Sequence, residues 1–213
     1  YDATEGNPLF VREVTRLVAT EGRLDRHGQL SISIPQSVRA LIRRRISPLS
    51  ADAVRVLSAA AVVGRDFDLK LVGPASELTN DRVLGSLSEA VALGVVSEEP
   101  DAVGVYRFSH PLMQEVIYDE LPIPARIQLH RLVGEAIERL HGQGSRFHLA
   151  QLAHHFAKAA PAGGGARARD YARMAGDQAM DACAYEEAVV DYRRALEALE
   201  FAGPDEALRC ELL

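Results

Sequence analysis

The chain has 213 residues, a quarter of them charged, and a formal net charge of −6 at pH 7. This acidic balance argues against bulk nucleic-acid binding, which requires lysine and arginine to neutralise phosphates. No apolar run is long enough to span a bilayer, and the sequence does not open with a basic-then-apolar leader. We therefore expect a soluble, cytoplasmic protein of one large or two small domains, with no membrane partner.

The sequence lacks the motifs of a self-sufficient enzyme. A Walker loop holds nucleotide phosphates with glycine N–H groups and a lysine. Lys70 and Lys158 are the only lysines, and neither follows a glycine-rich turn. No Ser/His/Asp or Cys/His set suggests catalysis, and two cysteines are too few for a disulfide framework or a zinc site. We expect no catalytic residues, no metal site and no cofactor within this chain.

Residues 1–33 are predicted to form one helix and a linker. In the stretch TEGNPLFVREV, Asn7 is a plausible N-cap and Pro8 a plausible first helical residue. Apolar residues then recur at helical spacing until Gly22. Because no strand precedes this helix, we expect it to be the tail of a preceding domain.

Three helices are predicted next, beginning at Pro35, after Ser50, and after Thr79 or Asn80. The stretch FDLKLVGPAS, between the second and the third, is interpreted as a short connector. Periodicity predicts that the inward-facing residues are Val38, Leu41, Ile42, Ile46, Val54, Leu57, Ala61, Val62, Val83, Leu84, Leu87, Ala90 and Val91.

A β-hairpin is predicted after these helices, from VVSEE at 95–99 and VYRF at 105–108. Three helices followed by a hairpin is the order of elements in a winged helix. A further helix from Pro111 is expected to pack against it.

The rest of the chain is predicted to be helical. ARIQLHRLVGEAIERLH and FHLAQLAHHFAKAA are expected to form an antiparallel pair, followed by a flexible break at PAGGGAR. Gly176, Ala188, Tyr192 and Ala195 then fit the 34-residue tetratricopeptide pattern, in which small residues let two helices approach and the tyrosine fills the gap. The predicted fold class is mainly α: a winged helix followed by an α-solenoid of tetratricopeptide-like hairpins. A lone repeat cannot bury its apolar face, so we expect the array to be truncated.

These signatures, in this order, resemble the signal-transduction ATPases with numerous domains, the STAND class. The sequence is most similar to the large LuxR-type ATP-binding regulators and to bacterial regulators that join an ATPase to a cyclase or kinase. The matching stretches are TEGNPLFVREV, IPQSVRALIRRRISPLSADAVRVLSAAAVVGRDFD, YRFSHPLMQEVIYDELP and the helical repeats beyond them.

The resemblance implies three regions: the last helix of a nucleotide-domain lid with a linker (1–33), a winged-helix lid (34–122), and the start of a helical repeat region that binds a protein or small-molecule effector (123–213). It implies ATP or ADP with Mg, held against an adjacent P-loop domain of the same parent chain. Pro8 would then pack on the adenine, and His110 would approach the β-phosphate of ADP. FSHPL departs from the family's Met-His-Asp triplet, because a proline follows His110.

His110 has two interpretations. Ser109 or His110 caps the helix that begins at Pro111, where first-turn N–H groups and the helix dipole suit a phosphate, and a histidine there donates a hydrogen bond without a permanent charge. The alternative is an ordinary capped helix start with a half-exposed ring. Pro8 is equally well explained as a routine first helical residue.

Arg39 and Arg43, in a run with Arg44 and Arg45, either contact a nucleotide phosphate or partner domain, or lie on a solvated face paired with carboxylates. The second interpretation is favoured, because surface arginine clusters are common. His148, His154 and His155 have loose metal-like spacing. They are interpreted as core or surface residues, since neighbours on a helix point about 100° apart.

A DNA-binding role for the winged helix is disfavoured by its charge. The candidate recognition helix, residues 80–93, sets Asn80 and Arg82 against Asp81 and Glu89. Acidic residues in the turn beyond it would also repel DNA. We therefore expect a protein-facing lid that does not bind DNA directly.

The sequence as a whole predicts the regulatory segment of a nucleotide-dependent switch, a transcriptional regulator whose parent chain is a slow ATPase. Two alternatives remain open: the regulatory half of a cyclase- or kinase-linked ATPase, and a helical protein–protein interaction scaffold without nucleotide dependence.

Overall fold

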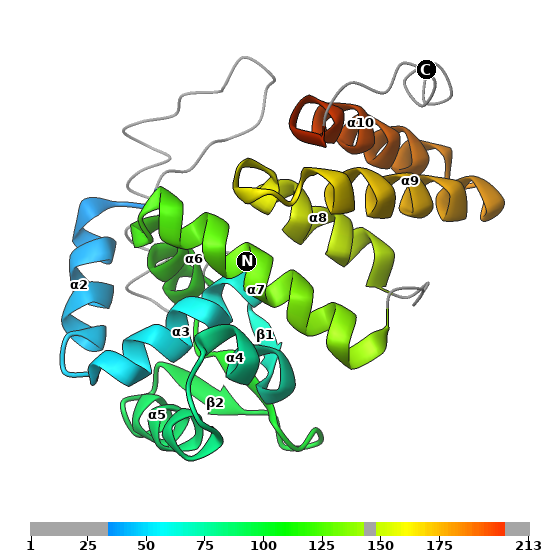
Figure 1. Ribbon diagram of the computed structural model, residues 1–213. Helices are drawn as coiled ribbons and strands as arrows, with labels where there is room; N and C mark the ends of the chain where they lie inside the picture. Colours follow the sequence, from blue (N-terminus) through cyan, green and yellow to red (C-terminus); the bar gives the residue numbers. More distant parts are fainter. Residues whose placement is uncertain (1–33, 143–147, 203–213) are drawn as a thin grey trace. The chain divides into compact units, whose positions relative to one another are not determined.

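The computed structural model describes residues 34–142 and 148–202 (Figure 1). This part of the chain is mainly helical and contains a small antiparallel sheet, as the predicted mainly α class requires. The chain divides into two compact units. The first contains the described residues up to Phe67 together with Leu78–Glu120, and the second contains Asp68–Glu77 and the described residues from Leu121 onward. The predicted helix of residues 1–33 lies outside the described residues.

The first unit is built from four helices. They are α2 (Gln36–Ile46), α3 (Ala51–Val63), α5 (Asn80–Ala92) and α6 (Pro111–Glu120). The predicted cap of α3 is confirmed, because the side chain of Ser50 accepts a hydrogen bond from the Ala53 N–H at 3.2 Å. Gly94, after the end of α5, has the positive φ of +64° that favours glycine at this position.

Eight of the positions predicted to face inward are buried in these helices: Val38, Ile42, Leu57, Ala61, Val62, Val83, Leu87 and Ala90. Ile46 is half-buried. For four others the prediction is wrong, because Leu41, Val54, Leu84 and Val91 are 37–46% exposed. Each adjoins a buried residue in the sequence, so the helical turn of about 100° per residue places it at the edge of the apolar face.

Three strands form the sheet of the first unit in the order β1–β3–β2. The predicted hairpin is confirmed as β2 (Val96–Glu98) and β3 (Val105–Phe108), which pair antiparallel with Val96 opposite Phe108. Strand β1 (Asp66–Asp68) adds Phe67, whose ring centroid lies 5.4 Å from that of Phe108.

The interpretation of FDLKLVGPAS as a connector is wrong. Its first residues belong to β1, and helix α4 (Leu69–Ser76) follows directly. Asp68 caps α4 by accepting a hydrogen bond from the Lys70 N–H at 2.8 Å. Gly73 and Pro74 make the segment look like a loop, but its buried apolar face packs on α7 (Ile123–His141) within the second unit. Tertiary packing therefore overrides the weak local preference.

Apart from α4, the second unit is a series of helices, each packed on the next (Figure 1). After α7 come α8 (Leu149–Ala159), a 3₁₀ turn η2 (Ala160–Ala162), α9 (Gly165–Asp181) and α10 (Tyr185–Ala202). None of the described helices of either unit combines the length and the apolar composition needed to cross a bilayer.

The stretch predicted as a flexible break has regular structure instead: η2 ends at Ala162, Gly163 and Gly164 form a tight turn, and Gly165 begins α9. Gly163 has a left-handed φ of +92°. A Cβ at Gly164 would lie 3.0 Å from the Ala159 carbonyl carbon, and one at Gly165 would lie 2.8 Å from the carbonyl carbon of Phe201. Only glycine lets these backbone segments approach so closely.

Helices α9 and α10 approach closely where Gly176 faces Tyr192. A Cβ at Gly176 would lie 2.6 Å from two carbons of the Tyr192 ring. The ring is held from its other end, because the Tyr192 hydroxyl donates a hydrogen bond to Asp177 Oδ1 at 2.9 Å. Ala188 and Ala195 on α10 are also buried. The predicted role of the small residues in letting these two helices approach is confirmed.

We expect Gly176→Ala to destabilise the second unit by about 1–3 kcal/mol, because overpacking against Tyr192 outweighs the better helix propensity of alanine. In a Tyr192→Ala background the same change should instead stabilise by up to about 1 kcal/mol. Urea unfolding of the four chains gives this double-mutant cycle. If Gly176→Ala stabilised the otherwise unmodified chain, the space between Gly176 and the Tyr192 ring would be large enough for a methyl group.

Candidate functional site

The predicted site residue His110 lies immediately before α6 and caps that helix. Its Nδ1 accepts a hydrogen bond from the Leu112 N–H at 3.2 Å. The residue is only 6% exposed, so the expectation of a half-exposed ring is wrong. Because one of the first-turn donors is taken by the ring itself, a phosphate could use that donor only if the imidazole moved away. Pro8, the other predicted nucleotide contact, lies outside the described residues.

Arg39 and Arg43 join α2 to the C-terminal end of α6. Arg39 Nη2 lies 2.7 Å from Asp119 Oδ2, and Arg43 Nε lies 2.6 Å from Glu120 Oε1. The pairs are partly exposed and are worth at most about 1 kcal/mol each. This is the carboxylate-paired helix face that the sequence favoured. A phosphate or a partner domain would have to compete with these carboxylates.

Arg82 and Glu89 of α5 are also bonded within the first unit. Arg82 binds both carboxylate oxygens of Asp52, at 2.6 and 2.7 Å. Glu89 accepts hydrogen bonds from the backbone N–H of Ser50 at 2.8 Å and from its hydroxyl at 2.6 Å. Arg82, the one basic side chain of the proposed recognition helix, is thus tied to α3.

Two histidines form a buried pair between α7 and α8 in the second unit. His130 and His155 are 1% and 2% exposed, and their Nδ1 atoms lie 2.9 Å apart. Burial lowers the pKa of each to about 3, and the neighbouring His154 adds to the shift. In the described part of the chain no group of three or more histidine, cysteine, aspartate or glutamate residues has an arrangement that could hold a metal ion.

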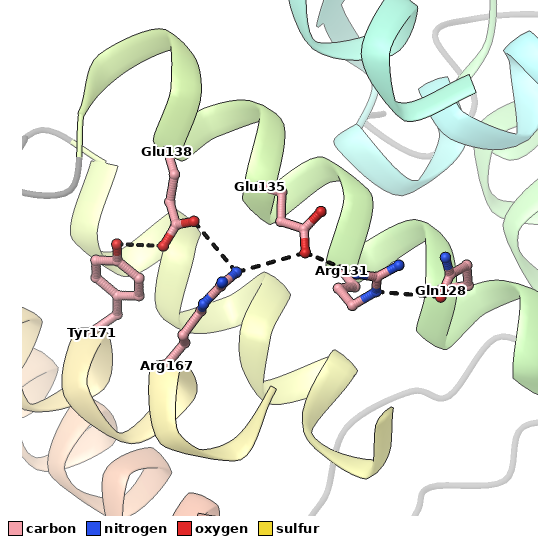
Figure 2. Close-up of polar contacts among 6 residues, drawn as sticks. All are labelled: Gln128, Arg131, Glu135, Glu138, Arg167 and Tyr171. Atoms are coloured by element: carbon pink, nitrogen blue, oxygen red, sulfur yellow. Dashed lines mark hydrogen bonds and ion pairs between the residues drawn. The ribbon is translucent and has the colours of Figure 1, made fainter. Parts of the chain in front are cut away.

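A polar cluster links α7 to α9 (Figure 2). Arg167 Nη1 lies 3.6 Å from Glu135 Oε1 and 3.5 Å from Glu138 Oε2. Tyr171 donates its hydroxyl hydrogen to Glu138 Oε1 at 2.6 Å, and burial together with this bond raises the pKa of the phenol. Charges and donors are matched inside the cluster, as in a structural link between helices.

An open groove of about 400 Å³ lies among α8, α9 and α10. Leu149 and five alanines form its apolar walls, and Gln178, Glu187 and Asp191 are its polar residues. Oε1 of Gln178 is buried without a hydrogen-bond partner among the described residues. Asp191 is 6% exposed and accepts a hydrogen bond from Arg194 Nη1 at 2.8 Å. This combination of small apolar walls and a few polar groups is typical of a ligand or peptide site.

Sequence reasoning did not identify the groove or the histidine pair. The alanines in α9 and α10 fit the repeat pattern, but that pattern does not show which of them face a neighbouring helix and which line a cavity. The spacing around His155 indicates only a metal ligand or a core or surface residue, because its partner His130 is 25 residues away on another helix.

No protein-family model, curated protein or solved structure matches the chain. What the chain does is therefore inferred from its residues and their geometry.

Proposed function

We propose that this chain is a regulatory segment whose second unit binds a protein partner in the groove among α8, α9 and α10. The observation that carries this proposal is the groove itself, an open site of about 400 Å³. Its walls are apolar, and its polar residues come from α9 and α10. An extended peptide has the alternating apolar and polar groups that such a groove accommodates.

The arrangement of the helices supports a repeat-type binding region. Helices α7, α8, α9 and α10 pack on one another in sequence order, and the contact between Gly176 and Tyr192 fits a tetratricopeptide-like hairpin. Such hairpins stack into an α-solenoid, in which each repeat contacts its neighbours and the stack offers an extended binding surface. Continuation of the stack beyond α10 is part of this proposal.

The groove can be tested by filling it. Ala182 is exposed and lines the groove at the end of α9, so Ala182→Leu should occupy the site without disturbing the core. Ala166→Leu is the matched control, because Ala166 is exposed on the same helix and does not line the groove. Peptides selected from a random display library on the unmodified chain should bind Ala182→Leu at least about tenfold more weakly, as expected for the loss of about 1.4 kcal/mol.

The control variant should bind the selected peptides as the unmodified chain does. Equal binding to the groove-filled variant, or loss of binding in both variants, would show that the groove is not the binding site. Circular dichroism of each variant excludes unfolding as the cause.

The second candidate is a nucleotide-dependent switch in which the first unit acts as a lid, and the strand order favours it. The helices α3 and α5 followed by the hairpin β2–β3, with the sheet order β1–β3–β2, are compatible with the winged helix proposed for this unit. In a parent protein with a P-loop domain, this lid would cover bound ADP, and a partner in the groove would change its preference between two arrangements. The switch would regulate transcription or, alternatively, the activity of a cyclase or kinase in the parent protein.

His110 allows this candidate to be tested, because its capping role and its predicted phosphate role can be separated. His110→Asp and His110→Asn should both retain a cap at Leu112, since aspartate and asparagine are strong N-caps. Aspartate also repels a phosphate. In a longer protein that contains this segment and a P-loop domain, the switch predicts that His110→Asp weakens ADP binding about tenfold relative to His110→Asn. Equal ADP affinity of the two variants would exclude the phosphate role of His110 and leave only its role as a helix cap.

A further inference from the structure

We infer that the groove among α8, α9 and α10 selects a protein segment that inserts a lysine or arginine side chain. This inference rests on the proposed function and specifies its partner. The polar residues that line the groove are Gln178 on α9, and Glu187 and Asp191 on α10, so the lining carries two carboxylates and one amide.

The charge of the lining is negative. No lysine, arginine or histidine is among the described residues that line the groove, whereas Glu187 and Asp191 both carry carboxylates there. Asp191 already has Arg194 as an ion-pair partner at 2.8 Å. Glu187 is exposed and makes no ion pair with another described residue. An anionic peptide would meet like charge at Glu187, whereas a cation would gain a partner.

The unfilled hydrogen-bonding capacity also favours a donor. Oε1 of Gln178 is buried and accepts no hydrogen bond from the described residues, and a buried acceptor without a donor is unfavourable. Lysine and arginine carry several N–H donors and no acceptor. Rotation of the Gln178 side chain toward an inserted cation would satisfy this oxygen.

The apolar walls suit the stem of the same side chain. Leu149, Ala175 and Ala179 line the groove with methyl and methylene groups. Lysine and arginine bury their aliphatic stems on apolar surface while their charged ends meet polar groups. The volume of about 400 Å³ accommodates such a side chain together with parts of its neighbours in the peptide.

Three capped pentapeptides, identical except for lysine, norleucine or glutamate at the centre, test the selectivity on the full chain by amide NMR titration. Norleucine keeps the aliphatic stem of lysine and removes the charge. We expect the lysine peptide to shift the amide signals of Gln178, Ala182 and Glu187, and to bind at least about fivefold more tightly than the norleucine peptide, as one partly exposed ion pair allows. The glutamate peptide should bind more weakly still.

Glu187→Gln should weaken lysine-peptide binding about fivefold, and Glu186→Gln, the same change on the adjacent exposed residue outside the groove, less than about twofold. Equal effects of the two variants, or norleucine binding as tightly as lysine, would overturn the inference. If Ala182→Leu still abolished binding of selected peptides in that case, the groove would remain a binding site for another chemistry. If it did not, the proposed function would fail as well.

Discussion

The free energy of unfolding of the second unit is expected to fall steeply as the pH is lowered below about 6.5, because His130 and His155 must be protonated on unfolding. Both rings are almost fully buried and share a hydrogen bond, and burial lowers their pKa values to about 3. His154, Lys158 and Arg126 add positive charge nearby, which further disfavours protonation of the pair.

The direction of this pH dependence follows from the pKa values of the two histidines in the folded and unfolded chain. Each histidine has a lower pKa when folded, about 3 against 6.5, so the unfolded chain binds more protons between these two values. The contribution of the two histidines to the free energy of unfolding is therefore fully present above pH 6.5 and is lost as the pH falls toward 3. The maximal slope is about 1.4 kcal/mol per pH unit for each histidine. Since small domains are stable by only about 5–15 kcal/mol, the unit should unfold before pH 3 is reached.

Urea unfolding at several pH values, followed by the NMR signals of Ile137 and Leu152, measures this loss. Replacing both histidines, His130→Leu with His155→Leu, should remove most of the pH dependence, because two apolar residues can replace a buried hydrogen-bonded pair at little cost. His154→Gln, which changes an exposed neighbour, should retain it. A pH dependence that survives the double replacement would show that other groups dominate the acid sensitivity.

Phe156→Ala is expected to destabilise the second unit by about 3–5 kcal/mol, the range for deleting a buried aromatic ring. Phe156 on α8 is fully buried. Its ring stacks on Tyr171 of α9, with 5.6 Å between centroids, and the Arg167 guanidinium lies 5.2 Å from its centroid. Gly134 on α7 gives the ring room, since a Cβ there would lie 3.0 Å from Phe156 Cζ. One side chain therefore joins three helices.

The control for this substitution is Phe201→Ala. Phe201 is 56% exposed on α10, so its truncation should change the stability by less than about 0.5 kcal/mol. Urea unfolding with an unchanged m-value measures both effects. Similar small losses for the two variants would mean that the helices are held together elsewhere, for example by the cluster around Arg167.

Much of the fold could be predicted from local sequence because its signals are local. Ser50 caps α3 and Gly94 follows α5 in a left-handed conformation, as their residue types require. The predictions from sequence were wrong where tertiary contacts determine the local structure. Helix α4 forms in spite of Gly73 and Pro74, and the glycines at 163–165 are fixed by the approach of Phe201 and Ala159.

The candidate sites were harder to predict than the elements. The sequence left the cap of α6 open between Ser109 and His110, and burial of the His110 ring depends on packing that periodicity does not reveal. The carboxylate partners of Arg39 and Arg43 lie about 80 residues further along the chain, at Asp119 and Glu120. The groove depends on three helices meeting, and no single stretch of sequence carries that information.

The most direct measurement of partner binding is an amide NMR map of the unmodified chain with a peptide selected by display. If the groove binds the partner, the shifted signals should cluster at Gln178, Ala182 and Glu187 and should be absent when Ala182→Leu fills the groove. Shifts confined to the first unit, or spread without focus over the surface, would contradict binding in the groove.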